Sequence, residues 1–315
     1  MARVQTLRGG VDADELGATL MHEHVFVVDP DIVENVQTDW DEQAALIDAG
    51  HRLDELYAAG IHTIVDLTVI GLGRSIPRLQ RVPMTEPLNI VVATGIYDLF
   101  DIPPYFKFRT TEVLVDHFVR EIEEGIGDTG VRAGILKCAT DEAGVTPGVE
   151  KILRAVARAH MRTGAPISTH THAGTRRGLD QLKVFAEEGV DPRRVVIGHS
   201  GDTTDLDYLL AVADSGAYLG MDRFGIDSLL GYDDRVATVA RLCSGGRANQ
   251  IVLSHDASCY IDYFRGGRPP KALGNWHYLH ISRDVIPALK ARGVTTEQID
   301  QMLVTNPRRV LGGVV

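Results

Sequence analysis

The chain has 315 residues, of which 44% are hydrophobic and 24% are charged, ordinary proportions for a folded globular protein. Its formal net charge of −11 argues against a nucleic-acid partner, because nucleic-acid-binding proteins concentrate Lys and Arg to neutralise phosphates. No apolar run approaches the roughly 20 residues of a membrane helix, and the three cysteines are too few and too scattered for a disulfide framework. We therefore expect a cytoplasmic protein that binds neither nucleic acid nor membranes.

The first predicted strand, residues 19–24, ends in Met21-His22-Glu23-His24. Successive side chains of a strand alternate between its faces, so His22 and His24 point the same way and Glu23 points away from them. Two converging imidazoles suit a divalent metal ion, although such a pair alone is more often two hydrogen-bonded side chains. We expect Glu23 to be a structural group behind the pair.

Short β-branched runs without polar alternation recur along the chain and predict parallel strands buried on both faces. After the first strand they occupy residues 62–68, 89–94, 133–137, 166–170, 194–199, 217–221 and 250–254, which makes eight in all. Segments with apolar residues at helical spacing are interspersed among them. These predicted helices span residues 41–60, 112–125, 149–164, 178–189, 205–216 and 233–243, followed by 285–293 and 296–303.

Eight βα units with right-handed crossovers close naturally into a (β/α)8 TIM barrel. The structural alternative is an open doubly wound sheet, but no Gly-x-Gly-x-x-Gly follows any predicted strand, and Gly71-Leu72-Gly73 lacks the third glycine. No linker or change of composition divides the chain. We predict an α/β protein with a single (β/α)8 barrel over residues 1–315 and its site at the C-terminal ends of the strands.

The endings of the predicted strands carry the chemistry, because barrel enzymes place their sites there. Potential metal ligands end or follow five of the strands: His22, His24, Lys137, His170, His199 and Asp256. Imidazole nitrogens and a carboxylate suit zinc, cobalt, iron or manganese. The convergence of these groups on one barrel mouth therefore predicts a metal site.

Lys137 stands out because it lies in the apolar run Ile135-Leu136-Lys137-Cys138, where a buried ammonium is costly. Desolvation lowers the pKa of such a lysine and leaves a nucleophilic amine. This amine can add carbon dioxide to form a carbamate, whose two oxygens can bridge two metal ions. The alternative is that Lys137 extends from the strand end to pair with Asp141 or Glu142.

The joint pattern of His-x-His, a strand-four lysine, histidines after strands five and six, and an aspartate after strand eight resembles the binuclear amidohydrolase superfamily. Within it, the flanking sequences are most similar to the phosphotriesterase-like lactonases. The similar stretches are residues 19–24, 134–140, 169–174, 196–199 and 219–223. The similarity runs from Thr19 to Arg309, nearly the whole chain.

The resemblance implies a binuclear centre bridged by a carbamate on Lys137 and by a hydroxide that attacks the lactone carbonyl. One ion would be held by His22, His24, Lys137 and Asp256, and the other by Lys137, His170 and His199. Asp256 would also accept the proton of the hydroxide and pass it to the leaving alkoxide.

Tyr97 and Arg223 match the substrate-orienting positions of the lactonases, where a phenol and a guanidinium could stabilise charge that develops on the lactone oxygens. Their structural alternatives are packing of Tyr97 over a loop and pairing of Arg223 with Asp222 or Asp227.

The apolar segment after Asp256 suits an amphiphilic substrate such as a lactone with an acyl chain. We expect Cys259, Tyr263 and Phe264 to contact the substrate, although some family members carry a tryptophan in this loop.

We therefore expect a homodimeric metal-dependent lactonase that opens N-acyl-homoserine lactones, a quorum-quenching activity, and has weak phosphotriesterase activity. Two alternatives stay open. One is a cyclic-amide or imide hydrolase with the same metal centre, and the other is a non-catalytic metal-containing binding protein.

Overall fold

The computed structural model describes residues 2–270 and 273–313 and contains the eight predicted strands. They run parallel, each paired with the next along the chain. Their bounds are β3 (Thr19–Val27), β4 (Thr63–Asp66), β5 (Asn89–Gly95), β6 (Ile135–Thr140), β7 (Ile167–Thr171), β8 (Val195–Ile197), β9 (Tyr218–Met221) and β10 (Ile251–Leu253). Nearly every residue of these strands is buried, which explains why they lack polar alternation.

The sheet curls until its last strand meets its first. The backbone N–H of His22 donates to Ser254 Oγ at 2.9 Å, and the N–H of Asp256 donates to the carbonyl of His22 at 3.0 Å. These bonds connect the segment that follows β10 to β3. The predicted TIM barrel is confirmed, and the open doubly wound sheet is wrong. The prediction of one domain over residues 1–315 includes positions 1, 271–272 and 314–315, which lie outside the described residues.

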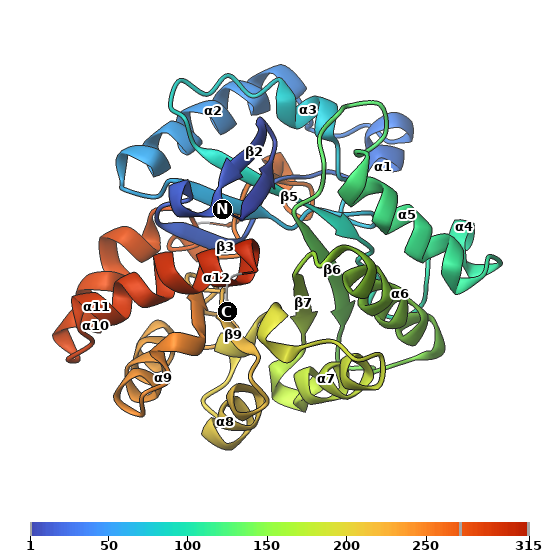
Figure 1. Cartoon of the computed structure of the whole chain (residues 1–315). Helices are drawn as coiled ribbons and strands as arrows, with labels where there is room; N and C mark the ends of the chain where they lie inside the picture. The colour runs from blue at the N-terminus through green and yellow to red at the C-terminus, as the bar shows by residue number, and fades with distance from the viewer. Residues whose placement is uncertain (1, 271–272, 314–315) are drawn as a thin grey trace.

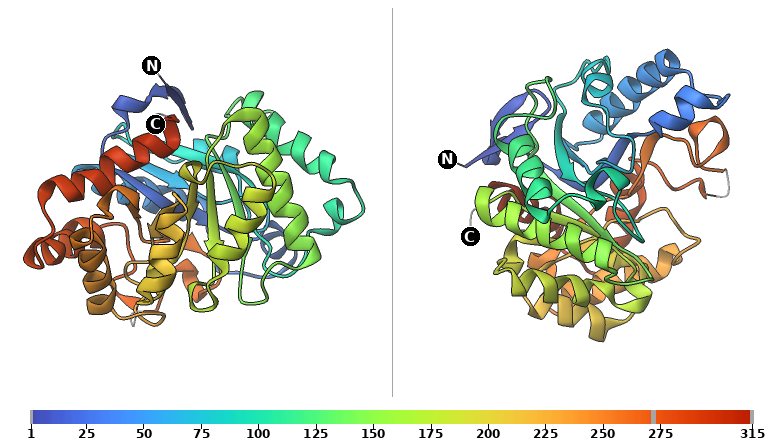
Figure 2. Two further views of the ribbon diagram at one scale, coloured as in Figure 1. Left: turned by 60° about the horizontal axis from the view of Figure 1, so that its bottom comes forward. Right: turned by 90° about the vertical axis from the view of Figure 1, so that its right-hand side faces the viewer.

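Helices surround the barrel on the outside (Figures 1 and 2). Six match predicted helices between or after the strands: α2 (Glu42–Ala58), α5 (Thr111–Glu123), α6 (Pro147–Thr163), α7 (Arg177–Glu187), α8 (Leu206–Asp214) and α9 (Tyr232–Ser244). Their ends follow local chemistry. The Thr146 side chain accepts from the N–H of Val149 at the start of α6, and Gly164 ends this helix in the left-handed conformation.

The last part of the chain is also helical. Wide turns at Ile281–Val285 and Gln301–Thr305 lead into α10 (Ile286–Ala291) and α12 (Asn306–Gly312), with α11 (Thr296–Asp300) between them. Short helices α1 (Pro30–Asn35), α3 (Ile76–Gln80) and α4 (Pro104–Lys107) lie in connections and were not predicted. None of the helices within residues 2–270 and 273–313 has the length and apolar character to span a membrane.

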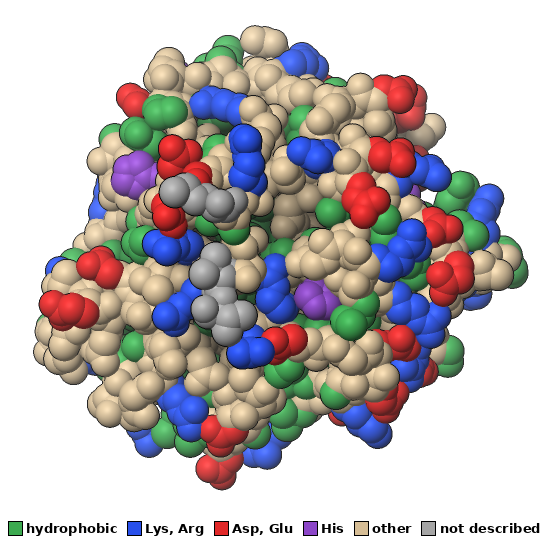
Figure 3. Space-filling view, viewed as in Figure 1, with side chains coloured by type: hydrophobic (Ala, Val, Ile, Leu, Met, Phe, Trp, Pro, Cys, Tyr) green, Lys and Arg blue, Asp and Glu red, His purple; other side chains and the backbone are tan. Residues whose placement is uncertain are grey.

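The described part of the chain forms three further strands that were not predicted. β1 (Arg3–Thr6) and β2 (Gly9–Asp12) form an antiparallel hairpin at the end of the barrel where the two termini lie (Figure 1). Acidic and basic side chains are mixed across this face (Figure 3). β11 (Ser258–Ile261) pairs in parallel with β3, with Ser258 opposite His24. The segment after β10 is therefore fixed to the sheet beside the strand that carries the His-x-His pair.

Candidate active site

One pocket of about 220 Å³ lies at the C-terminal ends of the strands and receives all six residues predicted as metal ligands. Its ionisable lining residues are His22, His24, Lys137, His170, His199, Arg223 and Asp256. Its apolar and aromatic lining residues are Val27, Leu72, Tyr97, Ile226, Leu229, Ile261, Tyr263 and Trp276. The four histidines and the lysine are buried, whereas Leu229 and Tyr263 are exposed at the rim.

The Asp256 carboxylate lies close to the imidazole rings of three histidines. Its Oδ1 lies 3.1 Å from His24 Nε2 and 3.3 Å from His22 Nε2, and its Oδ2 lies 3.8 Å from His199 Nε2. One ligand atom from each of His22, His199 and Asp256 lies within 4.8 Å of the other two, which is close enough for these groups to form part of a metal centre. The backbone is strained at two of these residues, because His199 and Asp256 both have positive φ, 60° and 54°.

Burial of His22, His170 and His199 favours their neutral form, which suits metal binding. Burial lowers the pKa of His22, lowers that of His170 to about 4 and lowers that of His199 well below its ordinary value. A neutral imidazole keeps one nitrogen lone pair for a metal. The donor set therefore fits divalent ions.

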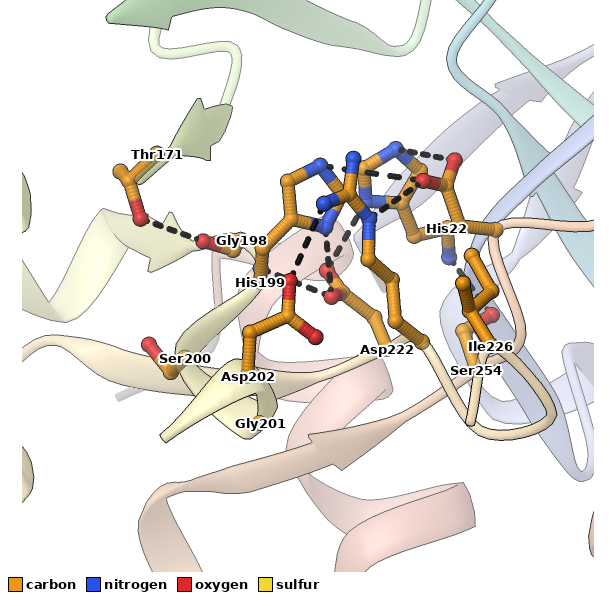
Figure 4. A network of polar contacts seen from close by, with 12 residues as sticks. His22, Thr171, Gly198, His199, Ser200, Gly201, Asp202, Asp222, Ile226 and Ser254 are labelled. Atoms are coloured by element: carbon orange, nitrogen blue, oxygen red, sulfur yellow. Dashed lines mark hydrogen bonds and ion pairs between the residues drawn. The ribbon is translucent and has the colours of Figure 1, made fainter. Parts of the chain in front are cut away.

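Asp222 holds two of these rings from behind, and the sequence did not indicate this. Its Oδ2 lies 2.8 Å from His22 Nδ1 and its Oδ1 lies 3.0 Å from His199 Nδ1 (Figure 4). From the sequence, Asp222 is expected only as a partner for Arg223. A carboxylate directly after a strand that ends at the barrel mouth was the available signal.

The other two histidines have separate partners. His24 Nδ1 lies 2.8 Å from Thr68 Oγ1, and His170 Nε2 lies 3.6 Å from Asp141 Oδ2. In each ring, one nitrogen therefore has a polar partner, and the second nitrogen is free to face the pocket.

Lys137 is 1% exposed, and its Nζ lies 3.1 Å from His22 Nε2. Burial lowers the pKa of this lysine to about 8. The Lys137 amine is buried against His22, whereas Asp141 lies beside His170 and Glu142 is exposed, so the predicted alternative, in which Lys137 pairs with Asp141 or Glu142, is wrong. A buried amine next to a metal-ligand candidate fits the predicted carbamate.

Arg223 and Tyr97 both line the pocket. The Arg223 Nε donates to Asp256 Oδ2 at 2.9 Å and its Nη1 donates to Asp202 Oδ2 at 3.0 Å, so the predicted alternative of a pair with Asp222 or Asp227 is wrong. The Tyr97 ring packs edge-on against the His170 ring at 5.3 Å. Burial raises the pKa of the Tyr97 phenol, so that it stays protonated and can donate a hydrogen bond.

The prediction for the segment after Asp256 needs correction at Cys259. Its side chain is 3% exposed, and its Sγ lies 3.3 Å from Tyr278 Oη, away from the pocket. Side chains of β11 alternate, so the neighbouring Ser258 lines the pocket instead. Tyr263 does line it, as predicted.

Phe264 is not among the residues that line the pocket. Its ring packs against Trp276 at a centroid distance of 6.0 Å, and Trp276 itself forms part of the pocket wall. The pocket is also lined by Trp276, Ile226 and Leu229, which were not predicted to line it, because their loops approach the mouth only in the folded chain.

A (β/α)8 barrel with a buried histidine and aspartate cluster at its strand ends is characteristic of metal-dependent hydrolases. The model of the Phosphotriesterase family matches residues 2–311, and the chain belongs to this family. The resemblance found in the sequence is therefore confirmed.

Relatives of known name agree over nearly full length. The phosphotriesterase homology protein of Mycobacterium tuberculosis is 58% identical, with 98% of each chain covered, and a solved phosphotriesterase structure from this organism has a TM-score of 0.95 over 98% of each chain. The aryldialkylphosphatase of Saccharolobus solfataricus is 38% identical, with 96% of this chain and 97% of the relative covered.

A further solved structure comes from the molecular engineering of organophosphate hydrolysis activity from a weak promiscuous lactonase template. It is 36% identical and has a TM-score of 0.91, with 99% of this chain and 100% of that chain covered.

Proposed function

We propose that this hydrolase is a binuclear metal-dependent lactonase that opens N-acyl-homoserine lactones and related lactones, with weak phosphotriesterase activity. The observation that carries the proposal is that the pocket has a polar inner end and an apolar outer wall. Buried ionisable groups line its inner end, and the exposed Leu229 and Tyr263 form an apolar wall at the rim. A polar ring with an acyl chain matches this division.

The donor set supports two ions, for which zinc, cobalt, iron and manganese are candidates. We assign one ion to His22, His24, Asp256 and a carboxylated Lys137, and the other to Lys137, His170 and His199. When bound, such ions polarise a carbonyl oxygen and lower the pKa of water.

The protein groups around the ions would position the substrate and move protons. Asp256, which faces both His22 and His24, is placed to accept a proton and return it to the leaving alkoxide. The protonated Tyr97 phenol and the Arg223 guanidinium are placed to donate hydrogen bonds to the substrate oxygens.

The test is hydrolysis of an acyl-homoserine lactone and of a phosphotriester, before and after removal of metal by a chelator. Lactone turnover should disappear with the metal, return on addition of metal, and be lost in Lys137→Ala. The exposed Lys183→Ala on α7 is the matched control and should keep its activity. Undiminished turnover in the metal-free protein or in Lys137→Ala would contradict the proposal.

The same preparation tests the alternatives. A lactam of the same ring size that is hydrolysed faster than the lactone would favour the amide hydrolase. A single tightly held ion with no turnover of either substrate would favour a binding protein. We also propose a homodimer, which sedimentation of the purified protein tests.

A further inference from the structure

We infer that Asp222 is a positioning residue shared by the two metal sites, whose single carboxylate commits His22 and His199 to present the same ring nitrogen to the pocket. This inference rests on the proposed binuclear centre, in which these two histidines bind different ions. Asp222 itself is 1% exposed and lies behind the rings (Figure 4).

Each oxygen of the carboxylate serves one histidine. Oδ2 lies 2.8 Å from His22 Nδ1, and Oδ1 lies 3.0 Å from His199 Nδ1. Oδ1 also accepts the backbone N–H of His199 at 2.7 Å. The carboxylate therefore fixes both the ring of His199 and its backbone, at a residue whose φ is 60°.

The consequence concerns where the imidazole protons are. An ionised carboxylate only accepts hydrogen bonds, so both Nδ1 atoms must carry a hydrogen, and both Nε2 atoms keep their lone pairs. These Nε2 atoms are the ones that face Asp256, at 3.3 Å from His22 and 3.8 Å from His199. A metal binds this lone pair and not an N–H.

The surrounding backbone makes room for this carboxylate. A Cβ at Gly220 would lie 2.6 Å from Asp222 Oδ2, and a Cβ at Gly198 would lie 3.2 Å from it. Both distances are too short for a side chain to be added without movement. Glycine at position 220 thus lets the carboxylate reach below both rings, whereas a Cβ at Gly198 would first meet the Thr169 carbonyl oxygen, at 1.9 Å.

His24 and His170 differ from this arrangement, because each has a partner of its own. Thr68 Oγ1 contacts His24, and Asp141 Oδ2 contacts His170. Loss of either partner should disturb one ion. Removal of the whole Asp222 carboxylate should disturb both ions, whereas an amide at this position can still accept the His199 N–H and should disturb mainly the ion at His22 and His24.

The substitution Asp222→Asn should affect the two metal ions unequally. The amide has one accepting oxygen and one donating NH2 group. The His199 side offers a backbone N–H, which can only donate, so the oxygen stays there. The NH2 group then faces His22 Nδ1, which must accept, and the His22 proton moves to Nε2. The ion at His22 and His24 should therefore be weakened before the ion at His170 and His199.

The experiment titrates the full-length metal-free protein with zinc and measures bound zinc at equilibrium. Wild type should bind two equivalents. In Asp222→Asn, we expect one ion to be retained and the affinity for the other to fall tenfold or more. Asp141→Asn is the matched control and should weaken only the ion at His170. Anomalous scattering from zinc-loaded crystals identifies the ion retained in each variant.

Two ions bound by Asp222→Asn at wild-type affinity, or loss of the His199 ion first, would overturn the inference. If the wild-type protein bound no zinc, the proposed function would be refuted. The inference about Asp222 would still be testable, because the tautomers can be read from the histidine ring ¹⁵N shifts of the metal-free protein. Hydrogens on Nδ1 of His22 and His199 would support the role of Asp222, and hydrogens on Nε2 would overturn it. The same spectrum decides the matter if the variant does not fold.

Discussion

Glu23 and His255 form a fully buried pair in which His255 Nδ1 lies 2.7 Å from Glu23 Oε1. The Glu23 carboxylate also accepts the backbone N–H groups of His255 and Ala257, each at 2.9 Å. His255 and Ala257 are the residues directly before and after Asp256 in the chain. Glu23, which lies between His22 and His24 but on the opposite face of β3, therefore holds the segment that carries Asp256 in place.

Glu23→Gln should destabilise the protein by about 1–3 kcal/mol, because an amide NH2 would face donors in a site with no water access. Urea unfolding followed by circular dichroism measures this. The exposed Glu34→Gln on α1 is the control and should change the stability by less than about 0.5 kcal/mol. Equal stabilities of the two variants would show that the Glu23 contacts contribute little.

The lowered pKa of Lys137 predicts a pH dependence for carbamate formation. Only the neutral amine reacts with carbon dioxide, and burial lowers the pKa of Lys137 to about 8. At constant dissolved carbon dioxide, the rate at which metal-free protein regains activity with added metal should rise about tenfold per pH unit below 8 and level off above it.

An ordinary lysine would instead give a rate that rises to a pH of about 10.4. The time course of reactivation distinguishes these profiles. Reactivation that does not depend on carbon dioxide would contradict the carbamate.

The largely buried ion pair of Arg74 and Glu121 predicts an acid-dependent part of the stability. Arg74 Nη2 donates to Glu121 Oε1 at 2.6 Å, and Thr94 Oγ1 donates to Glu121 Oε2 at 2.5 Å. Although burial opposes it, the hydrogen bonds from Arg74 hold the pKa of Glu121 below its ordinary value of 4.5. A lowered pKa means that the stabilisation is present above pH 4.5 and is lost as the pH falls through the folded-state pKa.

Glu121→Gln should therefore cost about 3–5 kcal/mol at neutral pH, because it leaves the Arg74 charge buried without its partner. The difference from wild type should shrink as the pH falls below 4.5, where wild type begins to lose the same interaction. Urea unfolding over a pH series measures both. Glu123→Gln, at an exposed position of α5, should show neither effect.

Tyr263 and Phe264 are neighbours with different surroundings, which predicts different roles. Tyr263 lines the pocket, whereas Phe264 packs on Trp276. Tyr263→Ala should raise the KM for long-chain lactones about tenfold, which corresponds to roughly 1.4 kcal/mol of lost apolar contact, and should leave short-chain lactones nearly unchanged. Phe264→Ala should have a smaller effect on both. Steady-state kinetics with a homologous series of acyl chains tests this, and equal effects of the two variants would contradict it.

The strands that form the barrel could be predicted because burial on both faces of a parallel sheet leaves a local signature, a short run of β-branched residues. The ligand candidates could also be predicted, since strand direction alone brings His22, His170 and His199 to one end of a barrel. β11 escaped prediction because its pairing with β3 is a contact between distant segments. Cys259 was misplaced for the same reason, since the register of β11 decides which of its side chains faces the pocket.

The sequence by itself determined the barrel, the set of groups at its mouth and the family, because these depend on periodicity and on residue types at strand ends. Only the tertiary structure decided how those groups are held. Asp222 contacts His22 across 200 positions of sequence, and Glu23 contacts His255 across 232. Such pairs carry no local signature, because barrel closure and the glycine that admits a buried carboxylate create them.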